Sequence, residues 1–228
     1  MLLKKWEALP SEFQNDEVKK YYDILKKKTF SLVLKRIFDI MLSFLFILVF
    51  SPLYIILAIS ILIDSGFPVI YKQSRITQFS KEFKVFKFRT MVRNADKIGT
   101  LVTIDNDSRI TRIGKFLRKY RLDELPQAFN VLFGSMTFVG TRPEVQKYVD
   151  AYTPKMLATL LLPAGITSLA SIKFKDESEM LEKAQDADSE YIEKILPLKM
   201  KYNLEYLAKF SFKDDISLIF KTIIAVFK

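Results

Sequence analysis

The chain has 228 residues, half of them hydrophobic, and a formal net charge of +10, with no His and no Cys. The lack of Cys excludes disulfides and thiolate chemistry, and the lack of His excludes the commonest general base at neutral pH, so catalysis would depend on carboxylates, Lys, Tyr, Ser or Thr. The positive charge favours a polyanionic partner, which could be a phospholipid surface, a nucleic acid or a phosphorylated substrate.

Residues 1–34 form a polar and charged N-terminal extension in which aromatic and apolar residues are widely spaced. This pattern fits either an amphipathic helix at a membrane interface or a poorly ordered tail, and the sequence leaves both alternatives open. A secretory signal peptide is a poor interpretation of this segment, because the apolar run that follows starts too late and is too long.

Residues 35–65 are expected to enter a membrane. The 27 residues from Ile37 to Ile63 carry one charge, Asp39, and as a straight helix they would measure about 40 Å, enough to cross a hydrocarbon core of about 30 Å. Both flanking segments are basic, which favours the cytoplasmic side for each. Ser51 and Pro52 offer a place to turn, because Pro removes a backbone hydrogen bond and a Ser hydroxyl can satisfy the freed carbonyl. A re-entrant helix–break–helix is therefore favoured over a kinked spanning helix.

Residues 66–228 have the composition of an ordinary domain. Segments 68–72 and 83–89 alternate apolar with polar residues and predict a short β-hairpin with a turn near 77–81. The last expected helix has an apolar face that either packs on the domain or lies on the membrane. The fold class is thus α+β, a small mixed domain with many short helices attached to a membrane hairpin. Helices are expected at 112–120, 125–133, 144–162, 178–199 (interrupted near Pro197) and 211–227.

Two adjacent carboxylates, Asp123 and Glu124, follow a dense series of cations. Apolar residues recur at helical spacing after them, and Pro126 is tolerated only in the first turn of a helix, so Asp123 falls at or just before a helix N-terminus. The helix dipole there favours an ionised carboxylate and attracts phosphate. Taken alone, the pattern also fits a simple N-cap beside a solvated cationic face. The cations are Arg109, Arg112, Lys115, Arg118, Lys119 and Arg121.

Two further cationic groups favour a phosphate site. Lys87 and Arg89 end the second predicted strand, and the turn Gly140-Thr-Arg-Pro143 presents Arg142. The guanidinium of Arg binds phosphate with a rigid two-pronged geometry. Three such groups beside an acidic pair, in a chain without His or Cys, indicate phosphate chemistry more than surface charge.

These motifs resemble, in order, those of the bacterial sugar transferase family, the monotopic polyprenyl-phosphate phosphoglycosyl transferases. The resemblance covers about residues 35–170, and its most specific part is the block Leu-Asp-Glu-Leu-Pro-Gln at 122–127. Thr141 departs from the Pro found there in many members, and residues 163–168 depart from the usual Pro-Gly-Ile-Thr-Gly. The motifs occupy residues 35–39, 51–52, 87–91, 107–111, 118–127 and 139–143.

The resemblance implies transfer of a sugar 1-phosphate from a UDP-sugar to polyprenyl (undecaprenyl) phosphate with release of UMP, the first step of polysaccharide, O-antigen or glycoprotein glycan assembly. Asp123 would attack the β-phosphate and form a covalent aspartyl phospho-sugar, and Glu124 would hold the metal or orient the acceptor. Mg²⁺ would bind the diphosphate, Asp123 and Glu124. An ionised carboxylate needs no general base, which is consistent with a site without His. The implied substrate-binding residues are Lys87, Arg89, Arg109, Arg112, Arg118, Arg142 and Pro143.

The resemblance also implies a place in the cell, the bacterial inner (cytoplasmic) membrane, with the catalytic domain, residues 66–228, on the cytoplasmic face. The membrane break lies at Ser51 and Pro52, and Lys35 and Arg36 are expected as anchors at the phospholipid interface. Nucleic acid is not expected as a partner, and a homodimer is left open. The alternative, a membrane-tethered basic binding or scaffold protein without catalysis, leaves the Asp–Glu pair unexplained.

Overall fold

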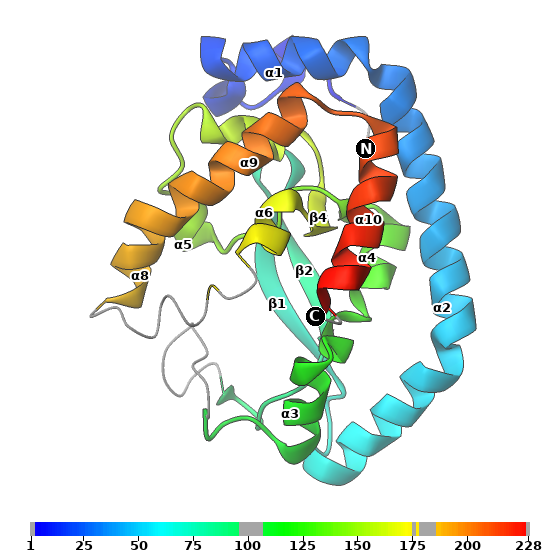
Figure 1. Cartoon of the computed structure of the whole chain (residues 1–228). Helices are drawn as coiled ribbons and strands as arrows, with labels where there is room; N and C mark the ends of the chain where they lie inside the picture. Colours follow the sequence, from blue (N-terminus) through cyan, green and yellow to red (C-terminus); the bar gives the residue numbers. More distant parts are fainter. Residues whose placement is uncertain (1–2, 96–106, 175–176, 178–185, 227–228) are drawn as a thin grey trace.

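The computed structural model describes residues 3–95, 107–174, 177 and 186–226. It has mixed helix and strand, with one long apolar helix along one side of a domain of short elements (Figure 1). The α+β class is therefore confirmed.

The N-terminal extension is part of the domain core. Two short 3₁₀ turns (Trp6–Ala8 and Ser11–Phe13) lead into α1 (Asp16–Lys27), which is capped by Asn15, whose side-chain oxygen accepts a hydrogen bond from the Val18 N–H at 3.0 Å. The apolar face of α1 is buried together with residues of the 3₁₀ helix η6 (Met156–Leu161) and of α9 (Leu196–Ala208). Figure 1 shows α1 lying across one end of the domain next to α9. Neither alternative from the sequence describes this segment: it is ordered and helical, and the apolar face of α1 packs on the domain where a membrane interface was considered.

Helix α2 (Thr29–Ser65) is continuous through Ser51 and Pro52, so a break at this point is not confirmed. The Ser51 hydroxyl donates to the carbonyl of Leu48 at 2.8 Å, as a Ser next to a helical Pro often does. Figure 1 shows the helix curving around the domain in the half that contains Pro52. The sequence boundary after residue 34 falls inside this helix, which begins at Thr29, five residues before residue 34.

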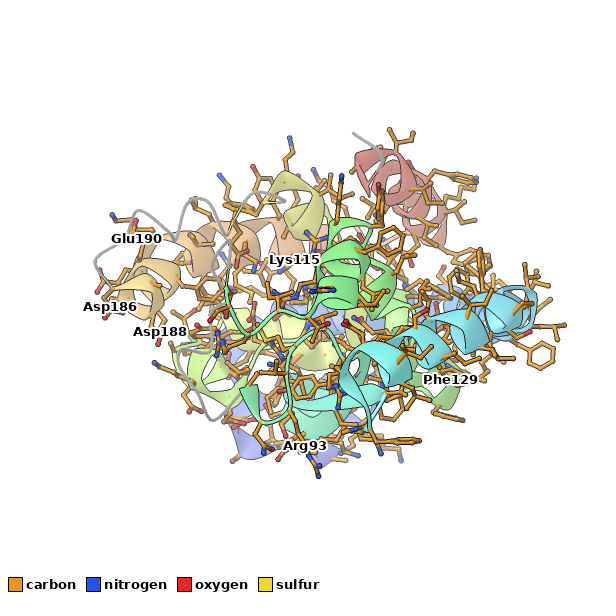
Figure 2. The ribbon with its side chains drawn as sticks, turned by 90° about the horizontal axis from the view of Figure 1, so that it is seen from below. Arg93, Lys115, Phe129, Asp186, Asp188 and Glu190 are labelled. Atoms are coloured by element: carbon orange, nitrogen blue, oxygen red, sulfur yellow. The ribbon has the colours of Figure 1, made fainter. Side chains whose placement is uncertain are left out.

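Helix α2 exposes apolar side chains and buries polar ones, the opposite of a surface helix on a soluble protein. Three polar residues four apart, Lys35, Asp39 and Ser43, face inward and are buried, whereas large apolar side chains face outward. Figure 2 shows these side chains projecting from α2, with Phe129 of α4 close by and α8 on the far side of the domain. By length and composition the helix could cross a membrane. Its exposed apolar residues include Ile37, Met41, Phe44, Leu45, Leu48, Val49, Ile55, Ile56, Ile59 and Ile63.

Hydrogen bonds attach the N-terminal half of α2 to the domain. The Lys35 ammonium donates to a carboxylate oxygen of Asp215 at 2.6 Å and to the carbonyl of Val139 at 2.8 Å. Arg36 donates to the last carbonyls of α4, at 2.6 and 2.8 Å. Lys35 is only 2% exposed, so it binds inside the protein, which differs from the interfacial position that the sequence predicts.

The C-terminal half of α2 is attached to the same domain. Tyr54 donates its hydroxyl proton to the carbonyl of Leu125 at 2.6 Å, and Asp64 accepts from the Ile113 N–H at 3.1 Å. Arg89 donates to the carbonyls of Ser65 and Gly66 just past the helix end. Both halves of α2 therefore lie against one domain.

The predicted β-hairpin is confirmed. Strand β1 (Ile70–Thr77) pairs antiparallel with β2 (Lys81–Phe88) through a 3₁₀ turn at Gln78–Ser80. β1 continues five residues beyond the alternating segment from which it was predicted, because pairing with β2 satisfies its backbone groups.

A second, parallel strand pair was not predicted. β3 (Met136–Val139) lies beside β4 (Ala164–Thr167), and the close approach of Gly140 to Gly165 ties the turn after β3 to β4. A Cβ atom on Gly165 would lie 2.2 Å from the Gly140 nitrogen, so only glycine fits there. Four-residue strands are too short to show an alternating pattern.

Two of the predicted helices are confirmed and the third is wrong. α3 (Arg112–Lys119) and α4 (Gln127–Phe133) agree with the expected segments. The segment 144–162 forms only a short α5 (Gln146–Val149) and the 3₁₀ helix η6. Pro154 disfavours the helical conformation of the residue before it, which accounts for the interruption.

The C-terminal helices differ from the prediction mainly at Pro197. α6 (Leu169–Lys173) is followed, after the residues outside the description, by α8 (Ala187–Glu190), a π-helical turn (Tyr191–Ile195) and α9. Pro197 lies in the first turn of α9, directly after the π-helical turn, and the helix continues past it to Ala208 where an interruption and an end at Lys199 were expected. Residues 178–185 of this expected helix lie outside the described residues. α10 (Phe212–Val226) is confirmed, with Asp215 and Leu218 buried and Phe220, Ile223 and Ile224 exposed.

Candidate active site

Asp123 and Glu124 lie in one 3₁₀ turn, η5 (Leu122–Glu124), between α3 and α4. Arg121 starts this turn with a φ of 56°, a left-handed conformation that a non-glycine residue keeps only where surrounding structure holds it. Pro126, rather than Asp123, is the N-cap of α4. The alternative that Asp123 serves only as a helix cap is therefore excluded.

Glu124 is held by three cations from three elements. Arg142 donates to its two carboxylate oxygens at 2.5 and 3.3 Å, and the ammonium of Lys87 and the guanidinium of Arg121 lie 3.9 and 4.0 Å from Oε1. Burial opposes ionisation of Glu124, but the attraction of Arg142 and Lys87 outweighs it and holds the pKa well below its ordinary value. Glu124 in turn raises the pKa of Arg142. The two residues form a fully ionised pair at neutral pH.

Asp123 has a different environment from its neighbour. Its side chain is 9% exposed, and in the part of the chain that the structure describes no hydrogen bond or ion pair joins its carboxylate to another residue. Burial, with a smaller contribution from Glu124, raises the pKa of Asp123, whereas Lys87, Arg118 and Arg121 act in the opposite direction. Asp123 is therefore a buried carboxylate with its lone pairs available, in a field of nearby cations.

Two further residues predicted for the site, Arg118 and Arg109, differ in how directly they interact with this pair. Arg118 donates to the Thr90 hydroxyl at 3.0 Å and interacts electrostatically with Asp123, so it belongs to the site. Arg109 is paired with Asp107 through contacts of 2.5 to 3.0 Å and acts electrostatically on Arg118. Hydrogen bonds from Arg109 hold the pKa of Asp107 at about 2.

Two predicted binding residues are not brought to the pair. Arg89 is almost fully buried and binds the end of α2. Arg112 is exposed at the first position of α3, and no described contact ties it to Asp123 or Glu124. The structure thus assembles the pair with Lys87, Arg118, Arg121 and Arg142 around it.

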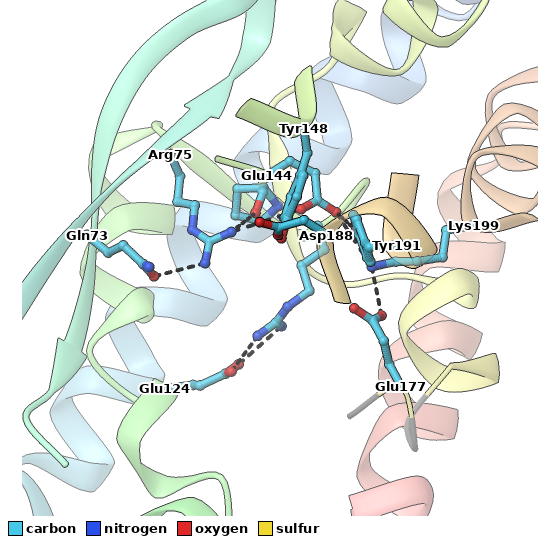
Figure 3. Close-up of polar contacts among 11 residues, drawn as sticks. Gln73, Arg75, Glu124, Glu144, Tyr148, Glu177, Asp188, Tyr191 and Lys199 are labelled. Atoms are coloured by element: carbon cyan, nitrogen blue, oxygen red, sulfur yellow. Dashed lines mark hydrogen bonds and ion pairs between the residues drawn. The ribbon is translucent and has the colours of Figure 1, made fainter. Parts of the chain in front are cut away.

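A cavity of about 220 Å³ opens beside Arg142 and Lys87. Figure 3 shows its polar network, in which Arg75 of β1, Glu144 of the segment before α5, Tyr191 of the π-helical turn and Lys199 of α9 converge, while Glu124 lies below. Lys87, Arg142 and the predicted Pro143 line this cavity, and Lys87 and Arg142 also contact Glu124. The residues lining it that sequence reasoning missed include Gln73, Arg75, Gln127, Glu144, Tyr148, Tyr191 and Lys199.

Comparison with known proteins gives the chain its family. Residues 30–228 match the family described as bacterial sugar transferase. The chain belongs to this family.

Its relatives carry names that specify different sugars. It is 35% identical over 169 residues to the UDP-N-acetylgalactosamine-undecaprenyl-phosphate N-acetylgalactosaminephosphotransferase of Aeromonas hydrophila, covering 73% of this chain and 37% of the relative. It is 37% identical over 174 residues to the UDP-glucose:undecaprenyl-phosphate glucose-1-phosphate transferase of Klebsiella pneumoniae, covering 74% and 34%. It is 32% identical over 172 residues to the undecaprenyl-phosphate galactose phosphotransferase of Salmonella typhimurium, covering 69% and 33%. The matched region thus spans about a third of the length of these curated relatives.

The residues that sequence reasoning missed in this sugar transferase carried a weak signal. Gln73 and Arg75 alternate on one face of β1, opposite Val85 and in register with the face of β2 that carries Lys87. Polar residues on the inward face of a hairpin are a hint of a site. Glu144 and Tyr191, by contrast, are 47 positions apart, and only the tertiary fold brings them together.

The carboxyl pair of this sugar transferase fits Mg²⁺ only together with a substrate that supplies phosphate oxygens. Among the described residues, no group of three or more Asp, Glu, His or Cys side chains gathers as a metal site. Mg²⁺ usually binds one or two carboxylates and completes its octahedron with substrate phosphates and water. Because Glu124 is occupied by Arg142 while Asp123 is free to accept, the donor set fits Mg²⁺ when a diphosphate supplies the other ligands.

Proposed function

We propose that this chain transfers a sugar 1-phosphate from a UDP-sugar to a polyprenyl phosphate such as undecaprenyl phosphate, with release of UMP. The observation that carries the proposal is the Asp123 carboxylate, which is buried among cations and joined by no hydrogen bond or ion pair to the described residues, beside a compensated Glu124–Arg142 pair. The names of the relatives support the reaction class, since each specifies an undecaprenyl-phosphate sugar phosphotransferase.

In the first step an Asp123 carboxylate oxygen attacks the β-phosphorus of the donor. The new Asp–O–P bond forms as the bridging bond between the β-phosphorus and its oxygen to the α-phosphate breaks, and the electron pair leaves with UMP. The product is an aspartyl phospho-sugar, and no proton needs to be removed from the nucleophile.

The main difficulty of this step is the repulsion between a carboxylate and an anionic diphosphate. Phosphoryl transfer is catalysed chiefly by positioning and by neutralisation of charge. Lys87, Arg118 and Arg142 converge on the carboxyl pair and would bind the phosphate oxygens. Asp123, the carboxylate of the pair that Arg142 leaves unoccupied, would hold Mg²⁺ together with the diphosphate, and the ion would neutralise further negative charge.

In the second step a phosphate oxygen of the polyprenyl phosphate attacks the same phosphorus. The Asp–O–P bond breaks, the carboxylate of Asp123 is regenerated, and a polyprenyl diphospho-sugar leaves. The acceptor phosphate lies at a membrane surface, so the site needs to be held at that depth.

We further propose that α2 is re-entrant and places the domain on the cytoplasmic face of the bacterial inner membrane. Its two halves bind one domain, through Lys35 and Arg36 at one end and Tyr54 and Asp64 at the other. A helix that spanned the membrane would carry its two ends to opposite sides. The outward apolar surface of α2, continued by Phe220, Ile223 and Ile224 of α10, supports contact with phospholipid.

The decisive experiment is the mass of the intact protein after incubation with a UDP-sugar and Mg²⁺ in the absence of acceptor. We expect a gain equal to one sugar phosphate, located on Asp123 by fragmentation, together with one UMP released per adduct. The variant Asp123→Asn should gain nothing, and Glu205→Gln, which removes an exposed carboxylate on α9 far from the pair in the fold, should still form the adduct. UMP release without any adduct on Asp123 would exclude the covalent mechanism, and no UMP release from any UDP-sugar would favour a binding or scaffold protein.

A further inference from the structure

The cavity beside Arg142 is lined by polar side chains that have no role in the transfer reaction as described so far, apart from Lys87 and Arg142 at its edge. Glu144, Tyr191 and Lys199 line it, and each is at least nine-tenths buried. Burial of so many polar groups is costly unless they bind one another or a ligand.

Hydrogen bonds hold Glu144 in a fixed orientation at this cavity. Its Oε1 accepts from the Tyr191 hydroxyl and lies 3.5 Å from the Lys199 ammonium, which in turn donates to the Tyr191 hydroxyl at 2.9 Å. Its backbone carbonyl accepts from the Ile76 N–H of β1 at 2.9 Å. Its Oε2 lies 4.0 Å from the nearest nitrogen of Arg75, beyond hydrogen-bonding distance, so this oxygen retains its capacity to accept.

Gln73 supplies the complementary group. Its side-chain oxygen accepts from Arg75 at 3.0 Å, and no described contact engages its NH₂ group. The cavity therefore offers a fixed carboxylate acceptor and an amide donor, the combination that recognises hydroxyl groups, each of which both donates and accepts.

We infer that this cavity binds the sugar of the donor, and that Glu144 and Gln73 select among sugars by hydrogen bonds to their hydroxyl groups. The inference rests on the proposed function. It assigns the sugar of the donor to the cavity and the phosphate that Asp123 attacks to the carboxyl pair and its cations. The structure brings a phosphate-binding pair, Lys87 and Arg142, to the boundary between the cavity and Glu124. The sugar is bonded directly to the phosphate that Asp123 attacks, whereas the nucleoside is separated from it by a second phosphate.

The size and lining of the cavity agree with a single sugar ring. About 220 Å³ is below the range of roughly 300 to 1,000 Å³ of pockets that enclose drug-sized ligands. Bases commonly stack on open aromatic faces, but here the rings of Tyr148 and Tyr191 pack on each other with centroids 4.5 Å apart. Tyr148 is further fixed by its hydroxyl, which donates to Asp188 at 2.6 Å.

The test compares turnover of three donors with binding of the shared leaving group. UMP release from UDP-glucose, UDP-galactose and UDP-N-acetylgalactosamine is measured for the wild-type chain, for Glu144→Gln and Gln73→Ala, and for Glu205→Gln, which removes one exposed carboxylate on α9. Inhibition by UMP, which carries no sugar, is measured for each. Melting temperatures confirm that each variant is folded, and Gln73→Ala, at a half-buried strand position with one side-chain hydrogen bond, provides a second variant if Glu144→Gln loses stability.

We expect Glu144→Gln and Gln73→Ala to lower kcat/KM for the best donor by about tenfold or more and to change the ratios among the three donors, because a hydrogen bond to a specific hydroxyl is lost. The inhibition constant of UMP should stay within about twofold of the wild-type value, and Glu205→Gln should leave all values unchanged. Unchanged kcat/KM and ratios in both variants would overturn the inference. If inhibition by UMP and kcat/KM for every donor weakened by the same factor, the nucleotide would be the part bound in the cavity, and the inference would also be overturned. A wild-type chain that releases UMP from no donor would instead contradict the proposed function.

Discussion

Two regions of the molecule bury charged groups, and they differ in whether each buried charge is hydrogen-bonded or ion-paired. Under α2, the Lys35 ammonium contacts Asp215 and the Val139 carbonyl, while Thr137 donates its hydroxyl proton to Asp39 at 2.7 Å. At η5, Glu124 is equally well paired, but Asp123 beside it has no described partner.

The difference separates groups that hold the structure from a group that does chemistry. A buried charge with a full set of partners stabilises one arrangement of the elements that carry those partners. A buried carboxylate without partners lowers stability and is retained where a ligand or a reaction uses it. The comparison therefore predicts opposite outcomes when each region is changed.

The largest effect is expected from Asp123→Asn. An amide cannot form the acyl phosphate, so transfer should fall by about 10⁴-fold or more, as for other lost nucleophiles. Stability should be equal or higher, because burial and Glu124 raise the pKa of Asp123 and so disfavour its charged form in the fold. Turnover is measured as UMP release and stability as a melting temperature in detergent. A large loss of melting temperature would place Asp123 among the structural charges.

The stability gain expected for Asp123→Asn should depend on pH. A carboxyl group whose folded pKa is raised destabilises the fold above its unfolded pKa and has no effect below it. The gain in stability of Asp123→Asn should therefore be present at neutral pH and disappear in acid, below the ordinary pKa of 3.8. A gain that persists unchanged in acid would exclude the electrostatic explanation.

The next effect is expected from Lys35→Met, at the other region. Removing one member of a buried ion pair leaves Asp215 without its cation, and the free energy of unfolding should fall by about 3 to 5 kcal/mol. The double variant with Asp215→Asn should recover part of this loss, because the uncompensated charge is gone and Asn can still accept from Tyr206, which donates to Asp215 at 2.7 Å.

Lys209→Met is the matched control for this change, since it removes one Lys of an exposed ion pair with Glu205. Its unfolding in detergent should differ little from that of the wild-type chain. If Lys35→Met also unfolds like the wild type, the attachment of α2 through Lys35 contributes nothing measurable, and the comparison between the two regions fails.

A smaller effect is expected from Arg142→Ala. It removes a phosphate-binding group and one of the cations that compensate Glu124, so kcat/KM should fall by about 10²-fold, mainly through a weaker affinity for the donor. The pKa of Glu124 should rise, because Arg142 is the strongest of the attractions that lower it. Stability that Glu124 contributes is present above its unfolded pKa and is lost as pH falls through the folded value, so in Arg142→Ala the acid loss should begin at higher pH.

The measurements are donor kinetics and melting temperature against pH. A large loss of melting temperature at neutral pH with unchanged KM would show that Arg142 serves the fold rather than the donor.

The sequence predicted those features that local patterns encode. Alternation in 83–89 predicts β2, and the Asp–Glu pair, Lys87 and Arg142 were found from residue types and turns before the structure brought them together. The strand pair β3–β4 was missed because its stability comes from a partner 28 residues away and from the contact of Gly140 with Gly165.

The inward position of Lys35 could have been found. Lys35, Asp39 and Ser43 recur every four residues, which places them on one face of a helix otherwise apolar. Charges on one face of an apolar helix bind protein rather than lipid, so this spacing predicts attachment to the domain. The residues around Glu144 could not be found in this way, since β1, α5 and the turn before α9 each contribute one or two residues.

The smallest effect is expected from Pro52→Ala, which tests how α2 is held. If Pro52 alone set the direction of the helix, the substitution would straighten it and move residues 1–30 across the membrane. The structure indicates otherwise, because α2 is already continuous at Pro52 and contacts at Lys35, Arg36 and Tyr54 bind both halves to one domain.

The chain has no Cys, so a cysteine introduced by Lys5→Cys or Lys84→Cys is the only site of labelling by a membrane-impermeant maleimide in sealed vesicles. The first reports the side of the N-terminal segment and the second the side of the domain. Both should label from the same side, with and without Pro52→Ala. Labelling from opposite sides in the unsubstituted helix would contradict the re-entrant placement, and a change of side caused by Pro52→Ala alone would mean that the proline, rather than the contacts with the domain, sets the path of the helix.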